Sequence, residues 1–226
     1  MNNPGFFKMV FSYFFPISLE KYHSMYSGNL MVVLENGKKV LNTNDVNYSY
    51  NSLHRVFKTA FKKSKLTINK DAKVLILGMG GGSIIQILRE DYLLSASIKL
   101  IEIDPIIIEI ACKEFGIKRF DPLDIVEMDA LTFINENTEV YNLICVDIFI
   151  NDRVPEKFLT VEFIQKIVNS LELGGSIYFN FMIPNDRIKT IFEDIFSFLL
   201  VKKDHGISNV FYLDLEENNK VLIVKK

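Results

Sequence analysis

The chain has 226 residues, of which 49% are hydrophobic and 24% charged, and its formal net charge at pH 7 is −2. These values exclude a disordered chain and predict an ordinary soluble globular protein with one medium-sized domain and a small appendage. The sequence contains no basic stripe and no nucleic-acid recognition motif, so we expect no nucleic-acid partner.

The cysteines and histidines restrict the cell compartment and the chemistry. Cys112 and Cys145 lie far apart in apolar segments without a C-x-x-C motif. Such cysteines are typical of buried thiols in a reducing compartment, so we expect a cytoplasmic protein without a disulfide. His23, His54 and His205 form no metal-ligand pair, and we expect no metal site.

The first segment, residues 5–18, is rich in aromatic side chains and is interrupted by Lys8 and Pro16. It is too short to cross a bilayer and has no cleavage site, so we expect no membrane span. We predict an aromatic helix that packs on its own domain or on a second subunit. Attachment to a membrane surface is the alternative.

Strands and a helix follow. Two apolar runs, residues 29–35 and 38–41, flank Asn36-Gly37, which predicts a β-hairpin. Residues 48–61 have helical spacing, with apolar side chains four positions apart. We therefore expect a helix that links the hairpin to the rest of the chain.

A glycine-rich turn between a strand and a helix is the central motif. Residues 74–77 are a short apolar run typical of a strand buried on both faces, and residues 83–90 have helical spacing. Four glycines lie between them: Gly78, Gly80, Gly81 and Gly82. Glycine lets a ligand approach the backbone closely, and a helix N-terminus offers free N–H groups. The motif indicates a nucleotide site; a plain strand-to-helix turn is the alternative.

The spacing of the turn favours one nucleotide class. Gly78, Gly80 and Gly82 match G-x-G-x-G, the pattern of S-adenosylmethionine transferases, better than the dinucleotide fingerprint. Glu102 follows the first glycine by 24 residues, where an acid binds a ribose diol. Asp104 precedes Pro105, so it is either a helix N-cap or a second ligand-binding acid.

Strands and helices alternate through the rest of the chain. We predict helices over residues 105–115, 129–134, 157–173 (with Gly174-Gly175 as C-cap) and 187–200, and strands over 98–104, 124–128, 143–149, 176–181, 209–214 and 221–224. This order predicts an α/β protein whose parallel sheet is covered on both faces. Glu102, Asp129 and Asp147 fall near carboxyl ends of strands, where ligands bind in such sheets, so we expect them in one crevice.

Five short motifs carry a family resemblance: residues 77–82, 101–105, 128–130, 146–149 and 155–163. Together they resemble the spermidine synthase family, the polyamine aminopropyltransferase branch of the class I S-adenosylmethionine-dependent methyltransferase superfamily. The resemblance implies a three-layer αβα Rossmann-like fold, a seven-stranded sheet whose last strand pair is antiparallel, and a possible homodimer. We therefore divide the chain into an N-terminal region, residues 1–63, and a nucleotide-binding domain, residues 64–226.

The resemblance also assigns roles to site residues. Gly78, Gly80, Gly81 and Gly82 would hold the nucleoside and amino-acid end of the cofactor. Glu102 would bind the ribose hydroxyls, and Asp129 with Ala130 the adenine. Asp147 would be the catalytic acid that orients or deprotonates the acceptor. The alternative for Asp129 is an N-cap, and the alternative for Asp147 is a carboxylate of the loop after a strand.

Three departures from the family pattern concern charge. The synthases carry acids where this chain has Gly81, Ile150 and Ser52, with Asp152 near the second position but out of register. Decarboxylated S-adenosylmethionine and a diamine are cations, and two unit charges about 4 Å apart interact by roughly 4 kcal/mol at an effective dielectric near 20. Loss of three acids therefore favours intact S-adenosylmethionine and methyl transfer.

Three hypotheses follow. The first is methyl transfer from S-adenosylmethionine to a small-molecule acceptor, with Asp147 positioning the acceptor or taking its proton. The second is aminopropyl transfer from decarboxylated S-adenosylmethionine to a polyamine, with Asp152 replacing the missing acid. The third is a nucleoside-binding module without turnover, because Ile148, Phe149 and Ile150 surround Asp147 with apolar side chains.

Overall fold

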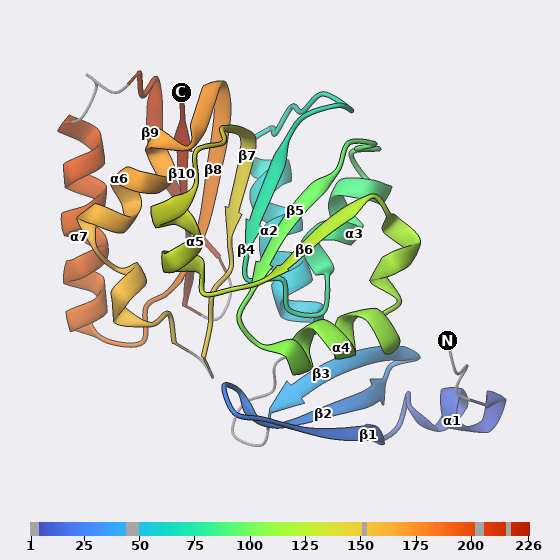
Figure 1. Cartoon of the computed structure of the whole chain (residues 1–226). Helices are drawn as coiled ribbons and strands as arrows, with labels where there is room; N and C mark the ends of the chain where they lie inside the picture. Colours follow the sequence, from blue (N-terminus) through green and yellow to red (C-terminus); the bar gives the residue numbers. More distant parts are fainter. Residues whose placement is uncertain (1–4, 44–49, 151–152, 202–205, 216–217) are drawn as a thin grey trace.

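The computed structural model describes residues 5–43, 50–150, 153–201, 206–215 and 218–226. A seven-stranded sheet forms its centre (Figure 1). Its strands are β4 (Val74–Leu77), β5 (Ile98–Glu102), β6 (Leu123–Glu127), β7 (Tyr141–Val146), β8 (Leu171–Met182), β9 (Asn209–Asp214) and β10 (Asn219–Lys225).

The strand order is β6-β5-β4-β7-β8-β10-β9. The first five run parallel, and β10 is antiparallel to both of its neighbours. From β4 the chain moves outward to β5 and β6, then crosses back to β7 on the other side of β4. A sheet of this kind has a crevice at the carboxyl end of the strand where the order reverses, which here is β4.

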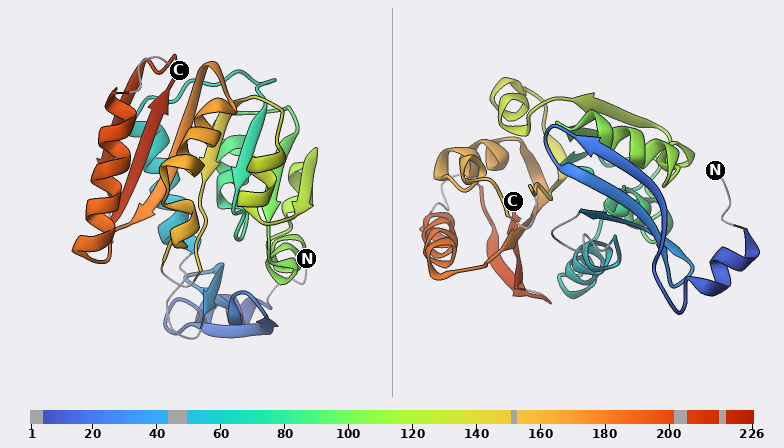
Figure 2. Two further views of the ribbon diagram at one scale, coloured as in Figure 1. Left: turned by 60° about the vertical axis from the view of Figure 1, so that its left-hand side comes forward. Right: turned by 90° about the horizontal axis from the view of Figure 1, so that it is seen from below.

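Helices cover both faces of the sheet, as two views show (Figure 2). One face carries α2 (Tyr50–Lys63), α3 (Ser83–Glu90) and α4 (Pro105–Lys113); the other carries α5 (Ala130–Glu136), α6 (Val161–Asn169) and α7 (Asp186–Val201). Two short 3-10 helices, Ile117–Phe120 and Glu156–Phe158, lie in the connections from α4 to β6 and from β7 to α6. The predicted three-layer αβα fold with a seven-stranded sheet is confirmed.

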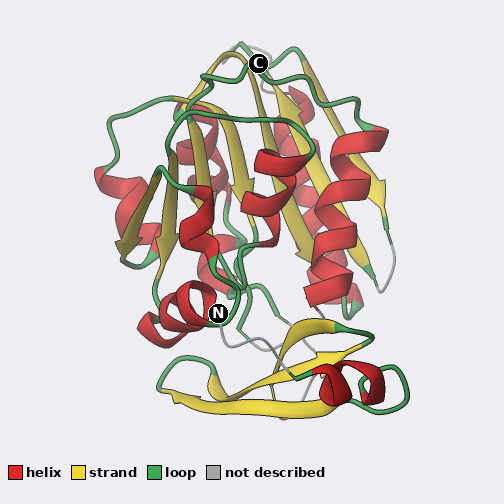
Figure 3. Ribbon diagram, turned by 90° about the vertical axis from the view of Figure 1, so that its right-hand side faces the viewer, coloured by secondary structure: helices red, strands yellow, loops and turns green. Residues whose placement is uncertain are grey.

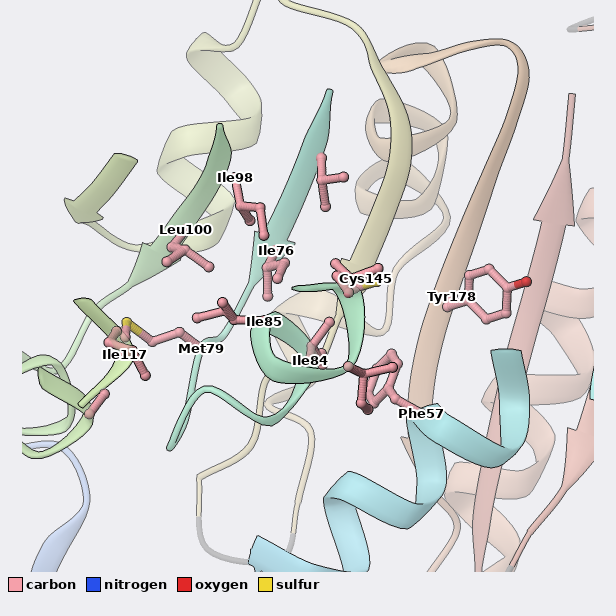
Figure 4. Close-up of a cluster of buried hydrophobic side chains, with 14 of the residues drawn as sticks. Phe57, Ile76, Met79, Ile84, Ile85, Ile98, Leu100, Ile117, Cys145 and Tyr178 are labelled. Carbon is pink, nitrogen blue, oxygen red and sulfur yellow. The ribbon is translucent and has the colours of Figure 1, made fainter. Parts of the chain in front are cut away.

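The alternation of side chains along the buried strands produces the two cores. Ile76 of β4 and Cys145 of β7 point to the α3 face, where they meet Ile84 and Ile85 of that helix and Phe57 of α2 (Figure 4). Leu75, Leu77 and Ile144 point to the opposite face and pack beneath α5 and α6. The strand bearing the glycine turn is thus fixed from both sides.

A second, three-stranded antiparallel sheet lies below the carboxyl ends of the large sheet (Figure 3). It consists of β1 (Ile17–Ser24), β2 (Gly28–Glu35) and β3 (Lys38–Thr43). The predicted hairpin at Asn36-Gly37 is present, with Glu35 opposite Lys38, and β1 adds a strand before it. Leu30, Val32 and Leu41 belong to the same buried cluster as α2, α3 and β4.

The aromatic segment forms α1 (Phe6–Phe11), which has no buried residue, so the predicted packing of this helix on the chain's own domain is not seen among the described residues. Phe6, Phe7 and Phe14 are each more than 70% exposed. The residue after the helix is held by the neighbouring hairpin, because the Ser12 hydroxyl accepts a hydrogen bond from the Gly37 N–H. Within the described residues, no helix is long and apolar enough to cross a membrane.

The prediction of one helix over residues 157–173 is wrong. The helix α6 begins after its N-cap Thr160 and ends at Asn169. Gly174-Gly175 is not its C-cap but part of β8, which begins at Leu171 opposite Tyr141 of β7. Pairing of Leu171 with β7 therefore outweighs the helical pattern of residues 170–173.

Candidate functional site

A pocket with about 1080 Å³ of empty space, part of it open to solvent, lies at the carboxyl ends of β4, β5, β6 and β7. Seven of the eight predicted site residues line it: Gly78, Gly80, Gly81, Glu102, Asp129, Ala130 and Asp147. Gly82 is the N-cap of α3, directly behind this turn. The structure thus brings residues from four strand ends to one place.

Gly78 joins the glycine turn to the end of β7. Its φ is +83°, in the region that favours glycine, and its N–H donates to the carbonyl oxygen of Ile101 at 2.9 Å. A Cβ at this position would lie 2.3 Å from the carbonyl oxygen of Asp147. Glycine is therefore required here, because the turn packs directly against the backbone of Asp147.

Gly80 has the opposite surroundings. Its φ is +47°, yet a Cβ there would meet nothing within 4 Å. The bare backbone of Gly80 faces the pocket, beside Gly81 and ahead of the N-terminus of α3. An open cradle of this kind fits the nucleoside end of S-adenosylmethionine.

Glu102 is fixed in orientation by backbone donors. Its Oε2 accepts from the Met79 N–H at 3.1 Å and its Oε1 from the Asp104 N–H at 3.0 Å. Burial raises the pKa of Glu102 above its ordinary value, although these two hydrogen bonds oppose the rise. A carboxylate has further lone pairs, so Glu102 can still accept from ribose hydroxyls in the pocket.

Asp129 is the N-cap of α5 and lines the pocket at the same time. Its Oδ1 accepts from the N–H groups of Leu131 and Thr132 at 3.1 Å each, and its Oδ2 forms an ion pair with Lys157. Burial acts to raise the pKa of Asp129, but the hydrogen bond from Lys157 and those from the backbone outweigh it, so the pKa is lowered. Asp129 therefore caps α5 and lines the pocket at the same time.

Asp147 follows β7 and is held by a neighbour on β8. Its Oδ1 accepts from the Asn180 Nδ2 at 3.0 Å. Burial raises the pKa of Asp147 to about 7; the Asn180 hydrogen bond lowers it and the charge of Glu102 raises it further. The acid is partly accessible from the pocket, so it can exchange a proton near neutral pH.

Much of the pocket lining around these acids is apolar. It includes Ile148, Phe149, Ile150 and Phe158, and also Leu30 and Leu41 of the small sheet. Of the three departures from the family pattern, Gly81 and Ile150 line the pocket. The side chain of Ser52 and the whole of Asp152 lie outside the described residues.

Asp104 connects the small sheet to this site. It caps α4 by accepting from the Ile106 N–H, as the N-cap prediction requires. Its Oδ2 also accepts from the hydroxyls of Ser24 and Ser27 at 2.5 and 2.6 Å, and Ser27 lines the pocket. Nothing in the local sequence indicated these contacts, or those of Lys157 and Asn180, because each joins distant segments.

Relatives with curated functions fall into two groups. The eEF1A lysine and N-terminal methyltransferase of Danio rerio is 26% identical over 149 residues, which is 57% of this chain and 21% of that protein. The polyamine aminopropyltransferase of Vibrio vulnificus is 30% identical over 114 residues, 49% of this chain and 38% of that protein. The chain thus spans well under half the length of either relative, and no family model matches it.

Solved structures share the fold. A probable spermidine synthase from Corynebacterium glutamicum has a TM-score of 0.62 at 16% identity, over 92% of this chain and 79% of that one. Human methyltransferase-like protein 13, in complex with SAH, has a TM-score of 0.57 at 22% identity, over 68% of this chain and 71% of that one. The likenesses together confirm the predicted resemblance and the class I methyltransferase fold.

Proposed function

We propose that this chain, which has the class I methyltransferase fold and resembles the spermidine synthase family, transfers a methyl group from S-adenosylmethionine to a small acceptor. The comparisons support a transferase and support S-adenosylmethionine as its cofactor. The observation that carries the choice of methyl transfer is the low negative charge of the pocket. Among the described residues, three carboxylates line it: backbone N–H groups hold Glu102, and Lys157 pairs with Asp129. Asp147, which accepts only from the Asn180 amide, is the one that remains for a cationic substrate.

Six of the eight predicted site residues have a task toward the cofactor or the acceptor in this proposal. Gly80 and Gly81 offer bare backbone to the nucleoside and amino-acid end, Glu102 accepts from the ribose hydroxyls, and Asp129 with Ala130 borders the adenine. When bound, S-adenosylmethionine supplies a sulfonium methyl group, whose bond to sulfur breaks as the acceptor's lone pair attacks. Asp147 orients the acceptor and takes the proton that it releases.

Charge argues against a diamine acceptor. Decarboxylated S-adenosylmethionine ends in an ammonium group and a diamine carries two more. Lys157 already neutralises Asp129, and the apolar side chains of Ile148, Phe149 and Phe158 cannot replace the missing acids. Intact S-adenosylmethionine carries a carboxylate, which meets no acid at Gly81.

Calorimetric titration with both forms of the cofactor tests this proposal. We expect the intact cofactor to bind at least tenfold more tightly, a difference of about 1.4 kcal/mol. Clear preference for the decarboxylated form would overturn methyl transfer. An Asp129→Asn variant is the matched control, because it should weaken both forms equally.

Aminopropyl transfer is the second candidate. Two observations favour it: the likeness to a probable spermidine synthase covers 92% of the chain, and the Vibrio vulnificus relative is an aminopropyltransferase. Incubation with putrescine and decarboxylated S-adenosylmethionine decides the matter. Spermidine as a product establishes this candidate, and its absence at high enzyme concentration eliminates it.

The size of the acceptor is a separate part of the proposal. Some relatives are methyltransferases of the protein eEF1A, so a protein acceptor is the alternative to a small molecule. An assay with S-adenosylmethionine that carries a radiolabelled methyl group, followed by separation of the labelled products by size, distinguishes the two acceptors. The absence of turnover with both a metabolite panel and a protein extract would instead favour the nucleoside-binding module.

A further inference from the structure

A buried amide on β8 touches the proposed catalytic acid. Asn180 is fully buried, and the strand register places it one position beyond the pair Val146 and Phe179, which is alongside Asp147. Its Nδ2 donates to Asp147 Oδ1 at 3.0 Å. Among the described residues, this is the only side chain that hydrogen-bonds to the Asp147 carboxylate.

The amide is expensive to bury at this place. Its neighbours along the strand are the buried rings of Tyr178, Phe179 and Phe181. The carbonyl oxygen of Asn180 has no hydrogen-bond partner within the part of the chain that the structure describes. A buried polar atom without a partner costs stability, so the residue requires an explanation other than folding.

We propose that Asn180 is a positioning residue, whose amide fixes one oxygen of the Asp147 carboxylate so that the other faces the acceptor. This inference rests on the proposed function, because Asp147 must contact the acceptor for its orientation to matter. An amide suits the task, since it donates a directional hydrogen bond without adding a charge beside the acid.

The charges around Asp147 make the donor important for its proton affinity as well. Glu102 on β5 and Cys145 on β7 interact electrostatically with the acid, and Asp129 lines the same pocket with its partner Lys157. Burial and Glu102 raise the pKa of Asp147, and the hydrogen bond from Asn180 opposes them. Loss of that donor should therefore raise the pKa further.

The test uses Asn180→Leu, a substitution of similar size that removes the donor. We expect a 10- to 100-fold lower kcat, little change in the KM of the cofactor, and an acidic limb of the pH–rate profile displaced to higher pH. A Tyr178→Phe variant is the control, because it removes another buried hydrogen bond of β8, the 2.6 Å contact with Ser64, outside the pocket. It should lower the Tm and leave the pH profile unchanged.

A second measurement does not depend on turnover. Carbon-13 NMR titration of the aspartate carboxyls reports the pKa of Asp147, and an Asp147→Asn variant identifies its signal. The pKa is compared between the wild-type chain and Asn180→Ala, in which the smaller alanine side chain cannot overpack the core. An unchanged pKa together with an unchanged kcat would overturn the positioning role. A wild-type protein that binds S-adenosylmethionine but never methylates would contradict the proposed function instead.

Discussion

The glycine turn after β4 and the β1–β2 turn of the small sheet line the same pocket, but different interactions hold them. The glycine turn is fixed by its backbone: Gly78 donates to Ile101 and packs against Asp147 with no room for a side chain. The β1–β2 turn is fixed by side chains, because Ser24 and Ser27 both donate to Asp104.

This difference separates the two halves of the pocket. Backbone contacts depend on conformation, so nearly any side chain at Gly78 would disrupt the part of the pocket that the glycine turn forms. The contacts of the β1–β2 turn are made by a few side chains. Single substitutions can therefore alter the part of the pocket that the small sheet forms while the fold persists. The fixed half would bind the cofactor and the adjustable half would select the acceptor.

The largest expected effect is that of Gly78→Ala, which should break the cofactor half. We expect the free energy of unfolding to fall by about 3 kcal/mol and cofactor binding to be lost, because a left-handed φ combines with a clash against the Asp147 carbonyl oxygen. Urea unfolding measures the loss. Gly80→Ala, where a Cβ meets nothing within 4 Å, should cost only about 1 kcal/mol. Equal losses would show that the turn is not held by this contact.

A smaller effect is expected from Asp104→Ala, which should loosen the adjustable half. Loss of a helix cap and of two serine partners should cost about 2 kcal/mol. Hydrogen exchange of the Tyr26 and Ser27 amides, which donate to Ser24, should become faster while that of Gly78 stays slow. The control is Asp124→Ala, which removes an exposed partner of Lys99 and should cost less than about 0.5 kcal/mol.

The smallest effect concerns the second attachment of the small sheet, where Lys39 pairs with Glu114 at 2.8 Å and Tyr22 donates to the same acid. Burial acts to raise the pKa of Glu114, but the hydrogen bonds from Lys39 and Tyr22 outweigh it and lower the pKa below its ordinary value of 4.5. The stability from this pair is therefore present above pH 4.5 and lost as the pH falls through the pKa of the folded state.

Lys39→Met tests that attachment. It should reduce the free energy of unfolding by about 1 kcal/mol near pH 7, and the difference from wild type should shrink in more acidic solution. Lys58→Met, which removes the partner of Asp91 in a more exposed pair, should have a smaller effect. A loss at pH 7 that persists undiminished below pH 4 would contradict the ionic contribution of Glu114.

Much of the site follows from short-range rules. The strand of residues 74–77, its glycines and the helix after them are adjacent in sequence, so local conformation dictates the turn. Glu102 ends β5, Asp129 lies two residues after β6 and Asp147 directly follows β7, and parallel strands bring their carboxyl ends together. Their ligand-binding roles, and the division of the chain at residue 63, stay predictions.

The errors arose where distant pairing competes with local pattern. Residues 170–173 continue a helical pattern, yet Leu171 pairs with Tyr141 of β7, thirty residues earlier, and the helix stops at Asn169. The predicted packing of the aromatic helix on its own domain is not seen among the described residues, where α1 has no buried residue, and its packing on a second subunit stays a prediction.

By itself, the sequence determined the class of fold, the glycine turn and the order of the acids, because these depend on neighbouring residues. Only the tertiary structure decided the partners of those acids: Lys157 for Asp129, Asn180 for Asp147, and Ser24 with Ser27 for Asp104. Each pair spans at least 28 positions in the chain, so the contact depends on a tertiary fold that brings distant segments together.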